Sequence, residues 1–136
     1  MGVVIGFDYG LRRIGVATGQ GLTQTATPLR ALRARDGSPN WEEIATLIME
    51  WKPSALVVGL PLNMDGSDSE MAARVRKFGN RLHGRFGLPV YFADERLSTQ
   101  EARALTGYQG RAGDQDGVLD AAAAACILER WLKDSV

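Results

Sequence analysis

Residues 3–10 read Val3-Val4-Ile5-Gly6-Phe7-Asp8-Tyr9-Gly10, so an apolar run ends in a carboxylate and a turn-forming glycine. A strand this apolar is expected to be buried on both faces. The Asp8 carboxylate would then lie at the rim of a low-dielectric sheet, where ionisation is costly without a nearby cation. The run therefore predicts a metal or phosphate site. Asp-x-Gly after a strand is also ordinary turn chemistry, and Asp8 alone does not decide between the two interpretations.

Five short apolar runs predict strands, and a tight turn at residues 9–12 joins the first two into a hairpin. The runs cover residues 3–8, 13–18, 25–29, 55–59 and 88–93. The third run is the weakest of the five. Residues 33–40, 63–69 and 106–117 are rich in Gly, Ser, Asp or Asn and are expected to be loops.

Helical periodicity fills the intervals between the later strands. Ser38-Pro39-Asn40 is a helix start signal, and apolar residues follow at helical spacing until Pro53. Further helices are expected at about residues 69–85, 99–105 and 118–132. This order predicts an α/β fold with a five-stranded mixed sheet, which has an antiparallel meander at its front, parallel crossovers behind it and helices on its flanks.

Length and composition limit the functional classes. A chain of 136 residues fits a single domain, residues 1–136, and is too small for two nucleotide-binding lobes. The 16 basic side chains balance the 16 acidic ones, so nucleic acid would have to bind a local basic patch. The lone Cys126 excludes an internal disulfide framework. No leader peptide and no membrane span is recognisable, and a cytoplasmic location is expected.

Two further acids stand where a structural role alone does not explain them. Glu95 follows Asp94 after the last predicted strand, and Asp120 lies on the apolar side of the final helix. Solvated loop acids and a helix-start carboxylate are the simpler interpretations. If Asp8, Glu95 and Asp120 met at one sheet edge, their repulsion would call for a divalent cation such as Mg²⁺. Two such ions can support hydrolysis of a phosphodiester.

Basic residues offer candidate substrate contacts, each with a plainer alternative. Arg12 and Arg13 lie in the hairpin turn, where they fit a nuclease site, a phosphate loop around Gly10, or an exposed turn. Asn63 lies in a loop after a strand, where turn formation is the simpler interpretation. A basic helix face is typical of the wet side of an amphipathic helix, and here it comprises Arg74, Lys77, Arg81 and Arg85.

Four motifs in order resemble the YqgF (RuvX) family over nearly the whole chain. They span residues 7–17, 57–66, 94–99 and 119–124. The resemblance implies a ribonuclease H-like fold related to the RuvC Holliday-junction resolvases. Family members are described as Holliday-junction resolvases and as nucleases that mature the 5′ end of pre-16S ribosomal RNA.

The resemblance also implies roles for individual residues. Asp8, Glu95 and Asp120 would hold one or two Mg²⁺ or Mn²⁺ ions as catalytic metal ligands. Independently of the resemblance, the candidate substrate contacts are Arg12, Arg13, Asn63 and Arg96, and the Arg74 to Arg85 helix face could also position the nucleic-acid backbone. Many family members carry a basic residue shortly before the third acid, whereas residues 113–117 here contain none. This departure weakens the expectation of tight substrate binding at that edge.

The residues and the resemblance together predict a metal-dependent endonuclease that acts on structured nucleic acid. The resemblance makes pre-16S ribosomal RNA the first candidate substrate and four-way DNA junctions the alternative. We expect a monomer or a weak homodimer. A non-catalytic RNA- or protein-binding module on the same fold is a second hypothesis. An ATP-handling domain is a third, which the missing second lobe disfavours.

Overall fold

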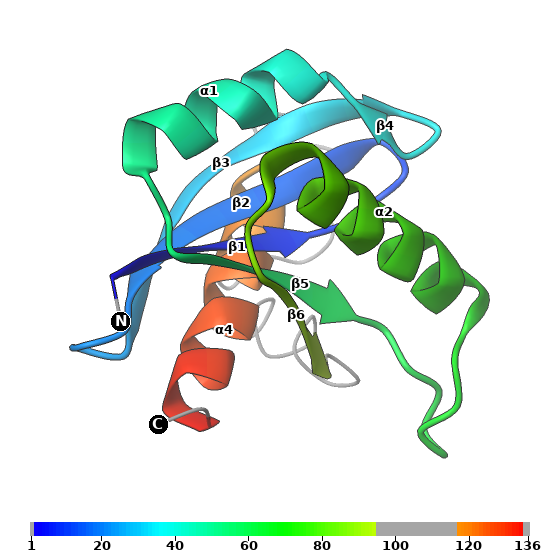
Figure 1. Ribbon diagram of the computed structural model, residues 1–136. Coiled ribbons are helices and arrows are strands. Elements are labelled where there is room, and N and C mark those ends of the chain that lie inside the picture. Colours follow the sequence, from blue (N-terminus) through cyan, green and yellow to red (C-terminus); the bar gives the residue numbers. More distant parts are fainter. Residues whose placement is uncertain (1, 95–116, 135–136) are drawn as a thin grey trace.

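The computed structural model describes residues 2–94 and 117–134, which form one sheet with helices on both faces (Figure 1). The strands are β1 (Val3–Asp8), β2 (Arg13–Gln20), β3 (Thr25–Arg35), β4 (Ser38–Pro39), β5 (Ala55–Leu60) and β6 (Val90–Asp94). The helices are α1 (Trp41–Trp51), α2 (Glu70–Phe86) and α4 (Val118–Asp134). The helix expected at residues 99–105 lies outside the described residues.

The sheet has the order β4-β3-β2-β1-β5-β6. Pairing is antiparallel from β4 through β1 and parallel from β1 through β5 to β6. The predicted front meander and parallel crossovers are therefore confirmed. Because β1, β5 and β6 run in the same direction, their carboxyl ends lie at one edge of the sheet. Asp8 and Asp94 are the final residues of two of these strands.

The described sheet has six strands, one more than the predicted five, because β3 is longer than expected and turns into a short β4. The sequence pattern suggested a strand of residues 25–29 followed by a loop, but β3 continues to Arg35. Asp36 and Gly37 make the turn at positive φ, and Gly37 donates its amide to the Leu11 carbonyl at 2.8 Å. Much of β3 is exposed to solvent and can therefore carry polar residues. Its sequence for this reason lacks the apolar pattern that marks a central strand.

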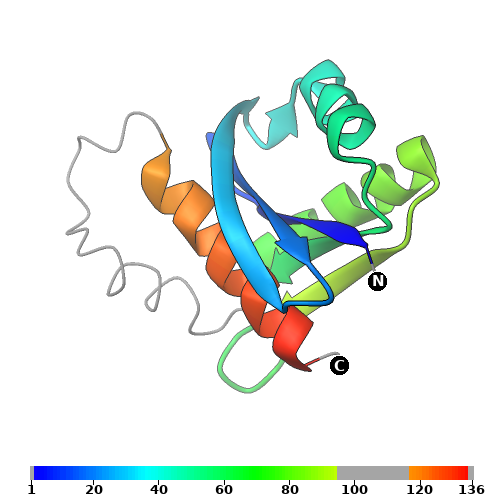
Figure 2. The same ribbon diagram turned by 90° about the vertical axis from the view of Figure 1, so that its left-hand side faces the viewer.

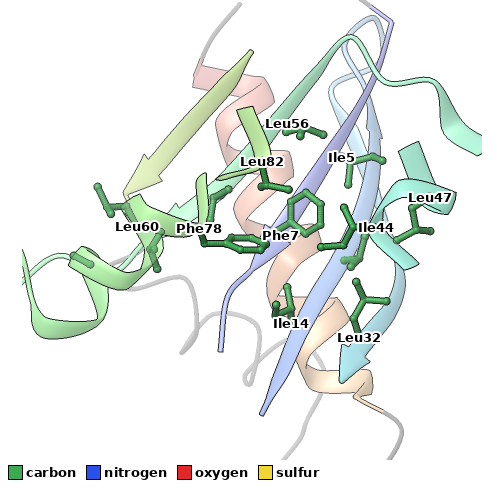
Figure 3. Close-up of a cluster of buried hydrophobic side chains, with 14 residues drawn as sticks. Ile5, Phe7, Ile14, Leu32, Ile44, Leu47, Leu56, Leu60, Phe78 and Leu82 are labelled. Carbon is green, nitrogen blue, oxygen red and sulfur yellow. The ribbon is translucent and has the colours of Figure 1, made fainter. Parts of the chain in front are cut away.

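One face of the sheet carries the larger apolar core, which α1 and α2 cover (Figure 2). Alternate strand residues point into it, so Ile5 and Phe7 of β1 lie on this face beside Ile14 of β2 (Figure 3). The rings of Phe7 and Phe78 meet edge to face with centroids 5.7 Å apart. This core fixes the central strands and so gives the edge bearing Asp8 a rigid base.

The opposite face is lined by small residues and is covered by α4 alone among the described helices (Figure 2). A Cβ atom added at Gly6 or at Gly19 would come within 2.9 Å of the Leu128 side chain of α4. Contacts that close are avoided in real proteins, so glycine at these positions lets the helix approach the sheet. The alanine-rich sequence of residues 121–125 serves the same close approach from the helix side.

The helices α1 and α2 begin and end at the signals found in the sequence. The Asn40 side chain accepts a hydrogen bond from the Glu42 amide at 3.0 Å at the start of α1. The Ser69 hydroxyl accepts one from the Ala72 amide at 3.1 Å at the start of α2, which ends at Gly87 with φ of 67°. Among the helices in the described residues, none has the length and apolar character needed to cross a bilayer.

Candidate active site

Asp8 lies on the α4 face of the sheet. Val4 packs into the core beneath α4, and Gly6 faces Leu128, so the alternation of side chains along β1 puts Asp8 on the same face. Asp8 is partly buried, and burial followed by the negative charge of Asp120 raises its pKa to about 7. The sequence analysis predicted that ionising a carboxyl at the end of the first strand would be costly, and the raised pKa of Asp8 agrees with that prediction.

Asp120 reaches Asp8 because a glycine stands opposite Asp8 on the neighbouring strand. Gly15 of β2 pairs with Asp8, and a Cβ atom at Gly15 would collide with the backbone carbonyl of Asp120. The first turn of α4 therefore rests directly on β2 beside Asp8. Gly117, at φ of 71°, precedes the helix and accepts a hydrogen bond from the Ala121 amide at 3.0 Å. The close contact between the α4 backbone and Gly15 therefore places the Asp120 carboxylate beside Asp8.

Arg13 adds a positive charge to this pair of acids. Its Nη1 atom lies 3.7 Å from Oδ2 of Asp120, with the two side chains 35% and 30% exposed. Arg13 precedes Gly15 by two residues in β2, so it projects from the same face. A pair this long and this exposed adds little to stability. Its position beside the acids suits it to orienting Asp120 or an anionic group.

The structure brings Asp8, Asp120 and Arg13 together, whereas Arg12 forms no ion pair with either of these two acids. Arg12 is exposed in the hairpin turn, where its backbone carbonyl accepts a hydrogen bond from the Ala34 amide at 2.8 Å. Glu95 and Arg96 lie outside the described residues. Within residues 2–94 and 117–134, no group of three or more His, Cys, Asp or Glu side chains is arranged to hold a metal ion.

The Asn63 side chain is engaged within its own loop. Its Nδ2 atom donates to the Ser67 hydroxyl at 3.0 Å and to the Asp68 carbonyl at 3.2 Å. The Ser67 hydroxyl in turn donates to the Asp65 carboxylate at 2.6 Å. These bonds give the loop after β5 a defined shape, which agrees with the simpler turn-forming interpretation. A substrate contact by Asn63 stays a prediction.

Gly15 and Gly117 are positioning residues to which the sequence analysis gave no role. A signal for Gly15 was present, because Gly15, Ala17 and Gly19 occupy alternate positions of one strand and so make one face of it small. Together with the alanine-rich final helix, that pattern indicates a close helix-to-sheet contact. No such local pattern exists for Gly117, whose added Cβ would collide with Ala31 on β3, far away in the chain.

Solved structures share this fold. Thermus thermophilus RuvC in complex with a Holliday junction substrate superposes with a TM-score of 0.54 at 20% identity, covering 99% of this chain and 96% of that one. The fowlpox virus resolvase in complex with Holliday junction DNA gives 0.56 at 11% identity, covering 98% and 99%. The fold is therefore that of the RuvC-like resolvases, within the ribonuclease H-like class, and the predicted fold class is confirmed.

Sequence comparison gives the family. The model of the family described as "RuvX: Holliday junction resolvase" matches residues 2–134. A relative from Aeromonas hydrophila, named "Putative pre-16S rRNA nuclease", is 56% identical over 96% of this chain and 94% of its own length. One of the same name from Alcanivorax borkumensis is 57% identical over 93% and 92%. The chain belongs to the RuvX family of nucleases, as the sequence motifs indicated.

Replacing Gly15 with alanine is expected to push α4 away from β2. The added methyl group has no free space, so we expect the free energy of unfolding to fall by about 1–3 kcal/mol. Chemical denaturation would measure this. Gly84→Ala is the matched control, because a Cβ atom there meets nothing within 4 Å and alanine should stabilise the helix by about 0.5–1 kcal/mol. A Gly15→Ala protein as stable as the wild type would contradict the close contact.

Replacing Asp8 with asparagine is expected to stabilise the metal-free protein at pH 8. The folded-state pKa of about 7 exceeds the ordinary aspartate value of 3.8, so the folded state binds more protons between these values and stability falls as pH rises through that window. Asparagine removes this loss, giving a gain on the order of 1–3 kcal/mol at pH 8 that vanishes near pH 4.

Denaturation at both pH values with a chelator present would measure the gain. Glu50→Gln, at an exposed position on α1, should stay within about 0.5 kcal/mol of the wild type. If Asp8→Asn gained no more free energy of unfolding than Glu50→Gln at pH 8, ionising the Asp8 carboxyl would cost no more than ionising a surface acid, which would contradict the raised pKa.

Proposed function

We propose that the chain is a metal-dependent endonuclease that hydrolyses phosphodiester bonds in structured nucleic acid. The observation that carries this proposal is the Asp8 carboxylate, which the fold holds beside Asp120 although burial and that second charge raise its pKa to about 7. Such an arrangement is unfavourable for the isolated protein. It becomes favourable once a divalent cation neutralises the two acids.

The donor chemistry fits Mg²⁺ or Mn²⁺, because both acids offer hard oxygen ligands and no soft ligand is involved. We propose Glu95 as the third metal ligand. It follows Asp94 directly in the chain, and Asp94 ends β6 at the same sheet edge at which β1 ends with Asp8. When bound, one or two such ions would activate a water molecule and stabilise the leaving oxygen of the phosphodiester.

The protein's own residues would prepare that chemistry. Asp8 and Asp120 supply the negative charge, and the α4 backbone resting on Gly15 keeps their spacing fixed. Arg13, 3.7 Å from Asp120, would help to orient that carboxylate. Arg12, Asn63 and Arg96 are the remaining candidates for contacts with the nucleic-acid backbone, which position a substrate without reading its sequence.

The substrate we favour is precursor 16S ribosomal RNA, cut at its 5′ end in the cytoplasm. The support is the name carried by relatives that are more than half identical to this chain over nearly its full length. A four-way DNA junction is the second candidate, since resolvases bound to such junctions share the fold. We expect the chain to act as a single catalytic domain, as a monomer or weak homodimer.

Cleavage assays would test the proposal with two substrates, a precursor RNA fragment carrying its 5′ leader and a four-way DNA junction. With Mg²⁺ or Mn²⁺ we expect cleavage of the RNA. Asp8→Asn, Glu95→Gln and Asp120→Asn should each lower the rate by at least about 100-fold, because loss of a metal ligand costs more than loss of an outer partner.

The matched control is Asp68→Asn, an exposed acid that pairs with Arg76 and should leave the rate near that of the wild type. Equal rates for Asp8→Asn and the wild type would reject the catalytic assignment. RNA binding without cleavage under either metal, unchanged when the acids are removed, would instead identify a non-catalytic binding module.

A further inference from the structure

A hollow of about 430 Å³ opens on the sheet face opposite the two acids, between α2, the start of α1 and the turn before β4. Its lining includes three aromatic residues, Tyr9, Trp41 and Phe78. It also includes three basic residues of α2, Arg74, Lys77 and Arg81. A volume of this order is typical of small-molecule sites and is sufficient for a single nucleotide. The family motifs and the candidate active site account for none of its basic residues.

The hollow adjoins the candidate active site through Tyr9, which directly follows Asp8. Because strand side chains alternate, Asp8 projects toward α4 and Tyr9 toward α2. The Tyr9 hydroxyl donates to the Gly37 carbonyl at 2.8 Å, and its ring lies 4.9 Å from that of Phe78. Tyr9 is thus held in place as a wall of the hollow. A strand passing over this edge of the sheet could meet both sites within a few nucleotides.

The charge in the hollow favours an anion. Asp36 is the acid that lines it, against three basic residues, which leaves an excess of two positive charges (three minus one). Asp36 lies 3.7 Å from Arg74, and both side chains are well exposed, so this pair is weak. Neither Lys77 nor Arg81 forms a salt bridge with another described residue. Two exposed cations four residues apart on one helix face can therefore accept phosphate groups.

The aromatic lining adds a surface on which a base can stack. Trp41 is half-buried at the first position of α1, and the Arg85 guanidinium lies 4.3 Å from the centroid of its ring. Unstacked bases stack on aromatic rings and on arginine guanidinium planes, and the Trp41–Arg85 pair offers both kinds of surface. A duplex would present its phosphates to such a surface but keep its bases inside. The combination therefore selects a single strand.

We propose that this hollow binds a single-stranded segment of the nucleic-acid substrate, with phosphates on Lys77 and Arg81 and a base against Trp41. The inference rests on the proposed nuclease function, to which it adds the form of the substrate beside the scissile bond. An unpaired leader or an unpaired junction arm would supply such a segment. The hollow would then hold the strand on one face of the sheet while the acids act at its edge.

Binding without cleavage tests the inference. The full-length protein, with a chelator present, would be titrated with short fluorescent single-stranded RNA and DNA and with a duplex of the same length. The Lys77→Gln/Arg81→Gln protein should bind single strands about 10-fold more weakly, with a slope of log K against log salt less negative by about 1.4, since each lost phosphate contact contributes about 0.7. Lys133→Gln, exposed on α4 and paired with Glu129, is the control and should bind as the wild type does.

Stacking is tested separately with Trp41→Leu, whose fold would be checked by thermal melting. This change should weaken binding of a single strand by about 5-fold or more, but leave binding of an abasic strand unchanged. Affinity and salt slope of the double variant equal to those of the wild type would overturn the assignment. A polyglutamate peptide that bound as tightly as the oligonucleotide would also overturn it, in favour of an acidic protein partner.

The two proposals can fail independently. If single strands bind in the hollow but the wild type cuts neither substrate with any metal, the nuclease function is rejected and the strand site stands. If the wild type cuts RNA but the double variant binds strands unchanged, the strand site is rejected and the nuclease function stands.

Discussion

The close packing of α4 on a glycine and alanine face of the sheet is the constraint on which the site depends. Gly6 and Gly19 admit Leu128, and Gly15 admits the backbone of Asp120 beside Asp8. Larger side chains at these positions would hold the helix further from the sheet and separate the carboxylates. The two acids, more than 100 positions apart in the chain, meet because the residues around them are small.

The face of the sheet under α1 and α2 carries the larger core, whereas the face under α4 carries the two acids. The aromatic and aliphatic core under α1 and α2 buries Ile5, Phe7 and Leu82 completely, which anchors the central strands. That stability offsets the cost of holding Asp8 near Asp120, a cost visible in the raised pKa. Unfavourable electrostatics of this kind are a common feature of catalytic sites. Family membership and the carboxylate pair thus point to the same class of chemistry.

Much of this could be predicted from the sequence, where the signal was local. The apolar run ending in Asp8 and the helical spacing of Asp120 predicted two of the acids, and Asn40 predicted the start of α1. The extension of β3 was missed because its polar residues lack an apolar pattern. The sequence left the basic face of α2 open between a wet surface and a substrate contact, since the aromatic lining that it shares comes from Tyr9 and Trp41, on other elements. Residues that come together from distant parts of the chain produce no pattern between neighbouring positions of the sequence.

The most direct test of the shared-cation account is a carbon-13 NMR titration of the Asp8 carboxyl with and without saturating Mg²⁺. Without the ion, we expect a pKa of about 7, because burial and Asp120 oppose ionisation. With the ion, we expect the pKa to fall well below the ordinary range of an aspartate, because the cation stabilises the charged form. An ordinary pKa in the metal-free protein, or a raised pKa that magnesium leaves unchanged, would contradict the account.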